Sequence, residues 1–364
     1  MAATYVIAGG YSAGHLTPGL AVAEALRRQQ PDLQVLFAGS PDPDEADFVR
    51  AAGVPFLALP GAPWAQRGPW AKTRSLAVIA PAVLRARREF RAVGAVGLMS
   101  LGSFAAVAPA LAARSLGLPI VIFEPNARFG LANRLIQPFA QRVLTSRLFD
   151  RGTIPASLPC AVVGVPLRSA LGALTQRVPS PPEGEVRLLV LGGSLGDSFL
   201  NERAPALAAR LGAAGIALRV THQCGRGVDP AAVRSAYVRL RIKAVVEPFL
   251  DPIAPALGDA HYILTAAGAV TMHEIAAAAV PVLIVPLGEA AAAHQHANAA
   301  TFARLTGCLQ STEESWDETK VAGEIAAVLR DAGRWRDQSR QLRKFASDDA
   351  GGDAVTQILA SLRS

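Results

Sequence analysis

The sequence predicts an α/β protein built from two doubly wound halves, each with a mostly parallel sheet, that face a central cleft. Three observations predict this fold class. Short β-branched runs alternate with longer helical segments along the chain. A proline-rich stretch near the middle breaks this rhythm once. Each half begins with a strand, a glycine-rich loop and a helix. A chain of 364 residues also exceeds one ordinary core and fits two domains.

The first half is expected to span residues 1–163. Its predicted strands are 4–8, 34–38, 55–59, 95–99, 119–123 and 142–145, and its predicted helices are 17–28, 43–52, 75–93, 105–115 and 130–140. Apolar residues gather on one face of the 17–28 segment, as in an amphipathic helix. Repeated strand–helix units with right-handed crossovers produce a parallel sheet.

A linker is expected at residues 164–186, where several prolines cluster. The second half, 187–340, has predicted strands at 187–191, 216–221, 244–247, 262–265 and 280–285, and predicted helices at 198–211, 268–278, 294–305 and from 320 onward. The last segment, 341–364, is expected to be a C-terminal helix. In open α/β sheets ligands bind at the carboxyl ends of the strands, so the cleft is expected there.

The composition limits the partners of this protein. Apolar residues make up 51% of the chain, which excludes a disordered protein. A net charge of +7 favours an acidic partner, which is a nucleic acid, an anionic lipid or a phosphorylated small molecule. The three cysteines, Cys160, Cys224 and Cys308, lie far apart. This scatter predicts a reducing cytoplasm, with neither a disulfide framework nor a zinc site.

Two segments bear on membrane insertion. The first ten residues have no basic region before their apolar run, so no signal peptide is expected there. Residues 92–113 carry no charge and are long enough to span a bilayer. Their glycines, serines and proline favour a strand, a glycine loop and a helix instead, and a membrane span is the alternative.

Two glycine loops are candidate anion-binding sites, at Gly9–His15 and at Gly192–Asp197. Glycines let a backbone approach an anion, and a following helix N-terminus supplies amide donors. Neither loop is a P-loop, because no Gly-Lys-Ser/Thr follows. The strand after the first loop ends in Gly39-Ser40 without an acidic residue, which disfavours NAD binding. A plain tight turn is the simpler alternative for each loop.

Polar side chains near these loops are candidates for chemistry. His15 follows the first loop and is a candidate general base at neutral pH, or a residue that caps its loop. Glu274 lies about two turns into a helix, where a carboxylate can accept both ribose hydroxyls, or where it is merely solvated. His294 and Gln295 lie near a helix start and suit sugar hydroxyls. His296 points away from His294, so no metal site is expected.

Residues 64–91 are a candidate membrane surface. They combine aromatic and basic residues with interleaved aliphatic ones, among them Trp64, Trp70, Lys72, Arg85, Arg87, Arg88 and Arg91. Such a composition suits an interfacial helix and loop on anionic lipid. A core-facing helix with a basic solvated edge is the alternative. No nucleic-acid motif accompanies the cluster, so no nucleic-acid partner is expected.

The motifs taken together resemble the MurG family along nearly the whole chain. The segments that carry the resemblance, in chain order, are Gly9–Ala23, Glu124–Asn126, Gly130–Arg134, Val163–Arg168, Gly192–Gly196 with Asn201, His222–Gly227, Glu247–Asp251, Gly268–Glu274, and His294-Gln295 with Asn298. The resemblance implies the GT-B type of the predicted fold. It also implies that the C-terminal helix returns to the first domain.

The resemblance implies an activity and its partners. Enzymes of this family transfer N-acetylglucosamine from UDP-GlcNAc to the muramyl 4-hydroxyl of lipid I with inversion, which makes lipid II for peptidoglycan synthesis. The implied place is the cytoplasmic face of the cell membrane, where the protein is peripheral and meets an anionic surface. No cofactor and no catalytic metal are implied.

The resemblance also implies residue roles. Donor binding would fall to Arg168, Gly193, Ser194, Gly268, Ala269, Glu274, His294 and Gln295, with the diphosphate at Ser194 and Arg168, the ribose at Glu274 and the sugar at Gln295. Acceptor binding would fall to Ser12, Gly14, Ser103 and Asn126, with His15 as the base or as an orienting group.

Several motif positions depart from the family pattern. Tyr11 and Ala13 replace glycines of the first loop, where an acceptor diphosphate would approach. Asp197 follows the second loop, where a carboxylate is unfavourable beside a diphosphate unless it points away. Ala266-Ala267 replaces an Arg-Ser pair of the family. These changes leave open a related UDP-sugar transferase with another acceptor, or a non-catalytic relative.

Overall fold

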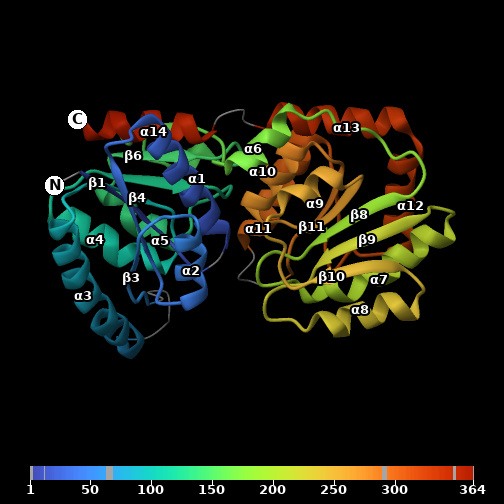
Figure 1. Cartoon of the computed structure of the whole chain (residues 1–364), viewed down its shortest axis with the longest axis horizontal. Coiled ribbons are helices and arrows are strands. Elements are labelled where there is room, and N and C mark those ends of the chain that lie inside the picture. Colours follow the sequence, from blue (N-terminus) through green and yellow to red (C-terminus); the bar gives the residue numbers. More distant parts are fainter. Residues whose placement is uncertain (1–2, 12, 63–68, 289–292, 347–349, 364) are drawn as a thin grey trace. The chain divides into compact units, whose positions relative to one another are not determined.

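The chain forms two compact units. The computed structural model describes residues 3–11, 13–62, 69–288, 293–346 and 350–363. Unit 1 comprises Met1–Arg168 and Asp349–Ser364, and unit 2 comprises Ser169–Asp348. Each unit has its own parallel sheet flanked by helices (Figure 1).

Unit 1 contains a seven-stranded parallel sheet in the order β3-β2-β1-β4-β5-β6-β7. Its strands are β1 (Thr4–Ala8), β2 (Gln34–Gly39), β3 (Phe56–Ala58), β4 (Ala95–Ser100), β5 (Ile120–Glu124), β6 (Arg142–Thr145) and β7 (Cys160–Val162). The central strands are apolar on both faces, because helices cover both sides of such a sheet. The strand order reverses between β1 and β4, so a crevice is expected outside their carboxyl ends.

The helices of unit 1 are α1 (Ala13–Gln29), α2 (Pro43–Ala51), α3 (Pro69–Ala92), α4 (Val107–Ser115), α5 (Leu131–Ile136) and α14 (Ala350–Leu362). The α2 helix begins after an N-cap, because the Asp42 side chain accepts a hydrogen bond from the Asp44 amide. α3 packs against α4. α14 packs against α1, and Arg142 of β6 donates a hydrogen bond to Gln357 of α14. The last helix of the chain thus belongs to the unit that contains the first strand.

Unit 2 contains a six-stranded parallel sheet in the order β10-β9-β8-β11-β12-β13. Its strands are β8 (Val186–Leu191), β9 (Leu218–Gln223), β10 (Lys243–Glu247), β11 (Tyr262–Ala266), β12 (Val282–Val285) and β13 (Leu309–Gln310). The order reverses between β8 and β11, which places the second crevice at the loops after these two strands.

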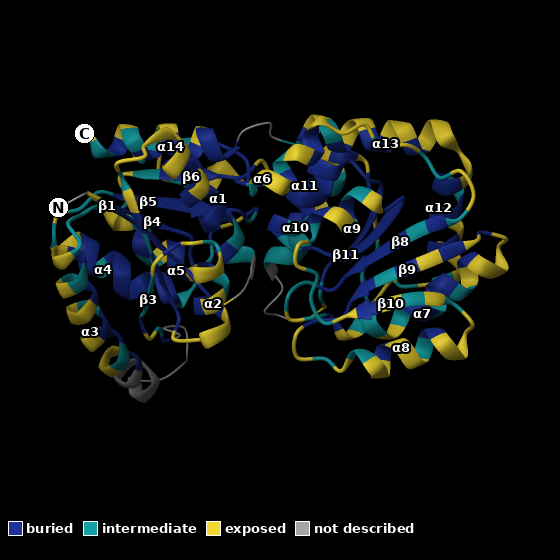
Figure 2. Cartoon of the chain, in the orientation of Figure 1, coloured by how far each residue is buried: buried dark blue, intermediate teal, exposed yellow. Residues whose placement is uncertain are grey.

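The helices of unit 2 are α6 (Ser169–Gly172), α7 (Ser198–Ala213), α8 (Pro230–Arg239), α9 (Ala254–Asp259), α10 (Ala269–Ala278), α11 (Ala293–Thr306), α12 (Glu318–Arg330) and α13 (Ala332–Phe345). α7, α8 and α12 share one core with alternate residues of the strands, such as Leu188 and Val190. Trp335 of α13 is fully buried at the edge of that core and donates a hydrogen bond to the His261 carbonyl. Figure 2 shows the buried strands in the middle of each unit.

The structure differs from the sequence prediction in its short elements and in one helix start. α8, α9, β7 and β13 were not predicted; β7 and β13 have only three and two residues, which carry little periodic signal. α1 begins at Ala13, four residues before the predicted start, so His15 lies in a helix and not in the loop. Part of the expected linker is ordered: α6 lies within it, and Leu171 and Leu174 are buried.

The uncharged stretch 92–113 contains β4 and α4, as the glycine and proline content favours. In the described part of the chain, no helix combines the length and the apolar character needed to cross a membrane.

Candidate functional site

Each unit gathers its glycine loop and polar side chains at the carboxyl edge of its sheet. In unit 2 the loops after β8, β9, β11 and β12 meet there, because the strands are parallel and neighbouring. In unit 1 the loops after β1, β4 and β5 meet in the same way. Most of the candidate residues predicted from the sequence therefore fall into two half-sites, one in each unit.

The unit 2 half-site is built around the loop Gly192–Asp197, between β8 and the N-terminus of α7. Ser194 is half-buried in it, and its carbonyl accepts a hydrogen bond from the Arg226 amide (3.1 Å). The side chain of Leu195 is exposed to solvent. The loop thus presents its backbone and the Ser194 side chain beside a helix N-terminus, an arrangement that binds phosphate.

Two glycines hold this loop against the loop that follows β9. Gly196 has φ of +85° and Gly225 has φ of +107°, a region that side chains rarely adopt. A Cβ atom on Gly196 would overlap the Cys224 carbonyl oxygen, and a Cβ on Gly225 would overlap the Gly196 backbone. The two loops pack backbone against backbone, which no other residue type permits at either position.

Gln223 at the end of β9 ties three loops together. Its Nε2 donates to the Gly193 carbonyl (2.8 Å), and its Oε1 accepts from the Leu250 amide (2.9 Å). The neighbouring His222 is buried between the Tyr237 hydroxyl and the Asn201 amide oxygen, each 2.9 Å from a ring nitrogen. Burial lowers the pKa of His222 to about 4, so the imidazole is neutral at pH 7. This polar network fixes the position of the glycine loop.

Asp197 does not oppose an anion in the loop, because its side chain points into the start of α7. It is the N-cap residue and accepts a hydrogen bond from the Leu200 amide (3.1 Å). It is 2% exposed, and burial raises the pKa of its carboxyl group. The departure from the family pattern at this position is thus explained by a capping role.

The second wall of this half-site is formed by α10 and α11. Gly268 is the N-cap of α10, and Ala269 is its first residue. Gln295 of α11 accepts hydrogen bonds through Oε1 from the amides of Ala267 (3.1 Å) and Leu287 (3.2 Å). Gln295 therefore connects the loop after β11 to the loop after β12. Both bonds use Oε1, so the Nε2 group is the part of this side chain that can bind a ligand. The preceding His294 is partly buried.

Glu274 is buried on α10 and is not the solvated helix residue of the alternative interpretation. It is 6% exposed, and no residue in the described ranges forms a hydrogen bond or ion pair with its carboxylate. Burial raises its pKa to about 7. A buried carboxyl group without a partner is costly to folding, and such groups concentrate at functional sites.

The unit 1 half-site contains the first glycine loop and the start of α1. Tyr11 adopts a positive φ of 67°, and its hydroxyl donates a hydrogen bond to the Gly61 carbonyl (3.3 Å). Gly14 and His15 lie in the first turn of α1. His15 is partly exposed, and burial lowers the pKa of its imidazole to about 4. Ser12, predicted to bind the acceptor, lies outside the described residues.

Glu124 at the end of β5 organises the rest of this half-site. It is 2% exposed and accepts four hydrogen bonds, from the Asn126 amide, the Asn126 side chain, the Gly130 amide and the Asn133 side chain, at 2.8–3.1 Å. Burial raises the pKa of Glu124, and these donors oppose that shift. Asn126 is thus fixed by Glu124 at the edge where the sequence places the acceptor.

Ser103 lies in the loop after β4 and has a positive φ of 63°. Its hydroxyl oxygen accepts a hydrogen bond from the Ala105 amide (3.3 Å). Ser103 and Tyr11 are two of the four non-glycine residues with positive φ in the described part of the chain. Backbone strain of this kind concentrates at functional sites, so its occurrence in two loops of one half-site supports their role.

Two further predictions concern Arg168 and metals. Arg168 is half-buried and is the last residue of the first segment of unit 1. Within the described ranges, no group of three or more His, Cys, Asp or Glu side chains is arranged to hold a metal ion.

Sequence reasoning quoted Glu124, His222 and Gln223 within motifs but gave them no roles. Each lies in the last two residues of its strand: Glu124 ends the apolar run of β5, and His222 and Gln223 end β9, whose apolar and polar residues are mixed. A polar side chain at the carboxyl end of a predicted strand was the signal available in the sequence. Their side-chain partners lie 2 to 30 positions away in sequence, which the pattern does not reveal.

Comparisons with known proteins match both halves of the chain. Residues 5–145 match the N-terminal domain of glycosyltransferase family 28, and residues 187–350 match its C-terminal domain. The chain is 34% identical to a UDP-N-acetylglucosamine--N-acetylmuramyl-(pentapeptide) pyrophosphoryl-undecaprenol N-acetylglucosamine transferase from Sorangium cellulosum, over 99% of this chain and 89% of the relative. It is 35% identical to the transferase of the same name from Methylococcus capsulatus, over 98% of both chains.

Solved structures of glycosyltransferases share the fold of this chain. The crystal structure of Acinetobacter baumannii MurG superposes with a TM-score of 0.72 at 27% identity, over 98% of this chain and 99% of that one. A kitacinnamycin glycosyltransferase shares the fold, with a TM-score of 0.70 at 16% identity. These neighbours confirm the GT-B fold predicted from the sequence. From its identity to these relatives over nearly its whole length, the chain belongs to the MurG family of glycosyltransferases, within glycosyltransferase family 28.

Proposed function

We propose that this enzyme transfers N-acetylglucosamine from UDP-GlcNAc to the muramyl 4-hydroxyl of lipid I, with inversion, to make lipid II. The names of its relatives state this donor and this type of acceptor. The observation that carries the proposal is the unit 2 glycine loop, whose backbone is held open at the N-terminus of α7 by the Gly196–Gly225 contact. Such a loop suits the diphosphate of a nucleotide sugar.

The donor is assigned to unit 2. The loop at Gly193 and Ser194 binds the diphosphate. When UDP leaves, the loop amides and the dipole of α7 stabilise the negative charge that develops on it. Glu274 accepts the ribose hydroxyls, which supply the hydrogen bonds that its carboxylate lacks. Gln295 contacts the sugar through Nε2, beside His294, Gly268 and Ala269.

The acceptor is assigned to unit 1. Asn126, Ser103, Gly14 and Ser12 line its diphosphate and sugar, and His15 accepts the proton of the attacking hydroxyl or orients it. A neutral imidazole is required for either role, and the lowered pKa of His15 provides it at pH 7. Attack on the anomeric carbon from the side opposite UDP inverts the configuration.

The proposed reaction is tested by UDP release from UDP-GlcNAc with and without a soluble lipid I analogue. We expect acceptor-dependent release that falls by about 100-fold or more in His15→Ala, because a positioned acid–base group contributes on that order. Gln141→Ala, an exposed residue of unit 1, serves as the matched control. UDP binding without release would favour another acceptor or a non-catalytic relative, and absence of UDP binding would contradict the donor site.

The pH dependence of kcat/KM tests the protonation state of His15. A base with a pKa of about 4 in the free enzyme stays neutral down to that pH. The Glu274 carboxyl group, with a pKa of about 7, also titrates in this range, so the profile is measured in the Glu274→Gln variant. In that variant we expect kcat/KM to remain level between pH 8 and about pH 5 and to decline only as the pH approaches 4. In the Glu274→Gln variant, an acidic limb centred near 6.5, the ordinary pKa of histidine, would contradict the lowered pKa of His15.

We further propose that unit 1 associates peripherally with the anionic cytoplasmic face of the cell membrane through α3. One face of α3 is buried through Ile79, Ala82 and Phe90. The opposite face exposes Leu76 and Leu84, at 50% and 67%, together with Arg85, Arg88 and Arg91. Arg87 is half-buried. Trp64 and the side chains of Trp70 and Lys72 lie outside the described part of the structure.

Vesicle pelleting tests this surface. The double change Arg85→Gln/Arg88→Gln is expected to weaken binding to phosphatidylcholine–phosphatidylglycerol vesicles by about tenfold or more, since each cation near an anionic surface contributes about 1 kcal/mol. The matched control is Arg239→Gln/Arg336→Gln, which removes two exposed charges from unit 2. Equal pelleting of the two double variants would exclude α3 as the contact.

A further inference from the structure

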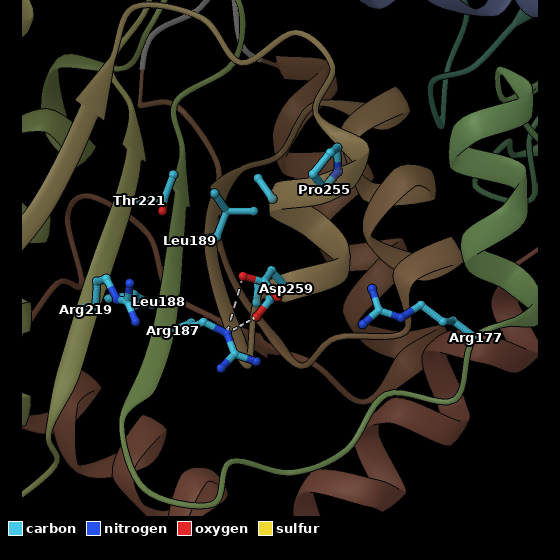
Figure 3. Close-up of a pocket in the computed structure, with 10 residues that line it drawn as sticks. Arg177, Arg187, Leu188, Leu189, Arg219, Thr221, Pro255 and Asp259 are labelled. Carbon is cyan, nitrogen blue, oxygen red and sulfur yellow. Dashed lines mark hydrogen bonds and ion pairs between the residues drawn. The ribbon is translucent and has the colours of Figure 1, made fainter.

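A second pocket lies in unit 2, at the opposite end of the sheet from the glycine loop. It is a solvent-open hollow of about 460 Å³ between β8, β9, α9 and the coil at Arg177 (Figure 3). Its strand residues are at the amino-terminal and middle positions of β8 and β9, beginning with Arg187 and Arg219. The glycine loop begins after the other end of β8, on the order of 15 Å away along the strand. The pocket is thus separate from the donor half-site.

Three cations stand in one row across β8, β9 and β10, and the first two of these strands border the pocket. Arg187 of β8 pairs in register with Arg219 of β9, and Arg219 pairs in register with Lys243 of β10. Residues in register on parallel strands point to the same face, about 4.8 Å apart. Like charges at this spacing repel one another, so such a row destabilises the sheet unless anions lie nearby.

The protein supplies only part of the required negative charge. Glu185 pairs with Arg219 (3.0 Å) and with Lys243 (3.6 Å). Asp259 pairs with Arg187 (3.7 Å), and the Asp259 carbonyl accepts a hydrogen bond from the Arg187 Nε (2.5 Å). One carboxylate is therefore shared by two cations.

The fourth cation, Arg177, faces the pocket from the other side. Its guanidinium group lies over Gly258 of α9, where a Cβ atom would overlap it. No acceptor in the described ranges binds this guanidinium group. Thr221 is half-buried in the pocket, and its hydroxyl group forms no hydrogen bond with any residue in the described ranges. The pocket thus has a cation and a hydroxyl group without protein partners.

The remaining walls are apolar. Leu189 lies two residues after Arg187 on the same face of β8, and Pro255 of α9 lies opposite (Figure 3). Ala256 of α9 also lines the pocket. Pockets of this size with apolar walls and a few convergent polar groups bind small molecules. Guanidinium groups bind phosphate oxygens through paired hydrogen bonds. We propose that this pocket binds an organic phosphate, whose phosphate is bound by Arg177 together with the guanidinium groups of β8 and β9, and whose uncharged part lies against Leu189 and Pro255.

Phenyl phosphate is the probe for this site, measured by calorimetry with saturating UDP so that the donor half-site is filled. We expect one saturable site that binds phenyl phosphate more tightly than inorganic phosphate, because the apolar wall contacts the ring. Arg177→Ala/Arg219→Ala is expected to weaken binding by about tenfold or more, on the scale of hydrogen bonds to charged groups. Thr221→Val is expected to weaken it by a few-fold.

Two further variants make the result decisive. Arg239→Ala removes an exposed charge elsewhere in unit 2 and is expected to change nothing. Glu185→Gln frees Arg219 and Lys243 from their shared carboxylate and is expected to tighten binding by about threefold. The proposal is overturned if phenyl phosphate shows no saturable binding beside UDP, if Arg239→Ala weakens it equally, or if Glu185→Gln loosens it.

The phosphate group could also belong to a lipid headgroup, and vesicles distinguish this source. Wild type and Arg177→Ala/Arg219→Ala are expected to pellet equally with phosphatidylcholine–phosphatidic acid vesicles, because the proposed ligand is a soluble small molecule. A specific loss of pelleting in this double variant would assign the phosphate to a lipid and overturn the small-molecule assignment.

Discussion

Replacing Glu274 with glutamine is expected to remove a pH-dependent cost from the folding of this protein. The native carboxyl group has a pKa of about 7 because it is buried, whereas its ordinary value is 4.5. Between these two pH values the native state binds more protons than the unfolded state. The free energy of unfolding therefore falls as the pH rises from 4.5 to 7, by a total of about 3 kcal/mol for this group.

The measurement is denaturant unfolding at a series of pH values. The difference in the free energy of unfolding between Glu274→Gln and wild type is expected to shift by about 3 kcal/mol in favour of the variant between pH 4.5 and 7.5. Other titrating groups cancel in this difference. Glu202→Gln, an exposed change on α7, is expected to show no such shift. A difference that stays constant with pH would show that Glu274 is not desolvated.

The same substitution is expected to weaken UDP binding. Glutamine offers one acceptor oxygen where the carboxylate offers two, so a pair of ribose hydroxyls loses a charge-assisted hydrogen bond. We expect a loss of about tenfold in affinity at pH 8. Glu274→Gln is thus expected to be more stable than wild type and to bind the donor less well, because the native carboxylate serves binding at a cost to folding. Unchanged UDP affinity would remove Glu274 from the donor half-site.

Gly196→Ala is expected to have the largest effect on donor binding. The added Cβ would overlap the Cys224 carbonyl oxygen, and the residue must also keep φ at +85°. The left-handed conformation alone costs about 1–2 kcal/mol for alanine. The two loops must separate to relieve the overlap, which displaces Ser194 and its amide neighbours. We expect UDP affinity to fall by about 100-fold and the free energy of unfolding by about 2–4 kcal/mol.

Calorimetry with UDP and thermal unfolding measure these two effects. Gly323→Ala is the matched control, because Gly323 lies inside α12 with nothing within 4 Å of an added Cβ. That change is expected to leave UDP binding unaltered and to raise stability by about 0.5–1 kcal/mol. Wild-type UDP affinity in Gly196→Ala would contradict the role of the backbone contact in shaping the loop.

The fold class follows from local sequence patterns, and the structure agrees with it. Apolar β-branched runs such as Thr4–Ala8 are buried on both faces, and periodic helical segments cover them. Proline and glycine set most boundaries, as at Asp42-Pro43, which begins α2. The sequence was less informative for α8, although Asp229-Pro230 gives it a similar start, because only Val233 and Tyr237 of this helix are buried and its apolar stripe is narrow.

Some features of the candidate site could likewise be predicted from the sequence, and others could not. Glycine loops at strand ends could be recognised from the sequence because they are continuous in the chain, and the family resemblance supplied residue roles. The burial of Glu274 and the capping role of Asp197 could not be predicted, because both depend on which atoms surround a side chain. Gln295 was expected to contact a sugar, and the structure adds that its Oε1 holds two loops.

The sequence by itself determined the two α/β halves, the position of the glycine loops at strand ends, and membership of a glycosyltransferase family. These depend on periodicity and on contiguous motifs, which are local properties of the chain. Only the tertiary structure decided that Gly196 and Gly225 touch and that Gln223 joins three loops. It also revealed that Arg187, Arg219 and Lys243 stand in one row. Register and packing bring together residues that are far apart in sequence, so contacts of this kind are decided by the fold.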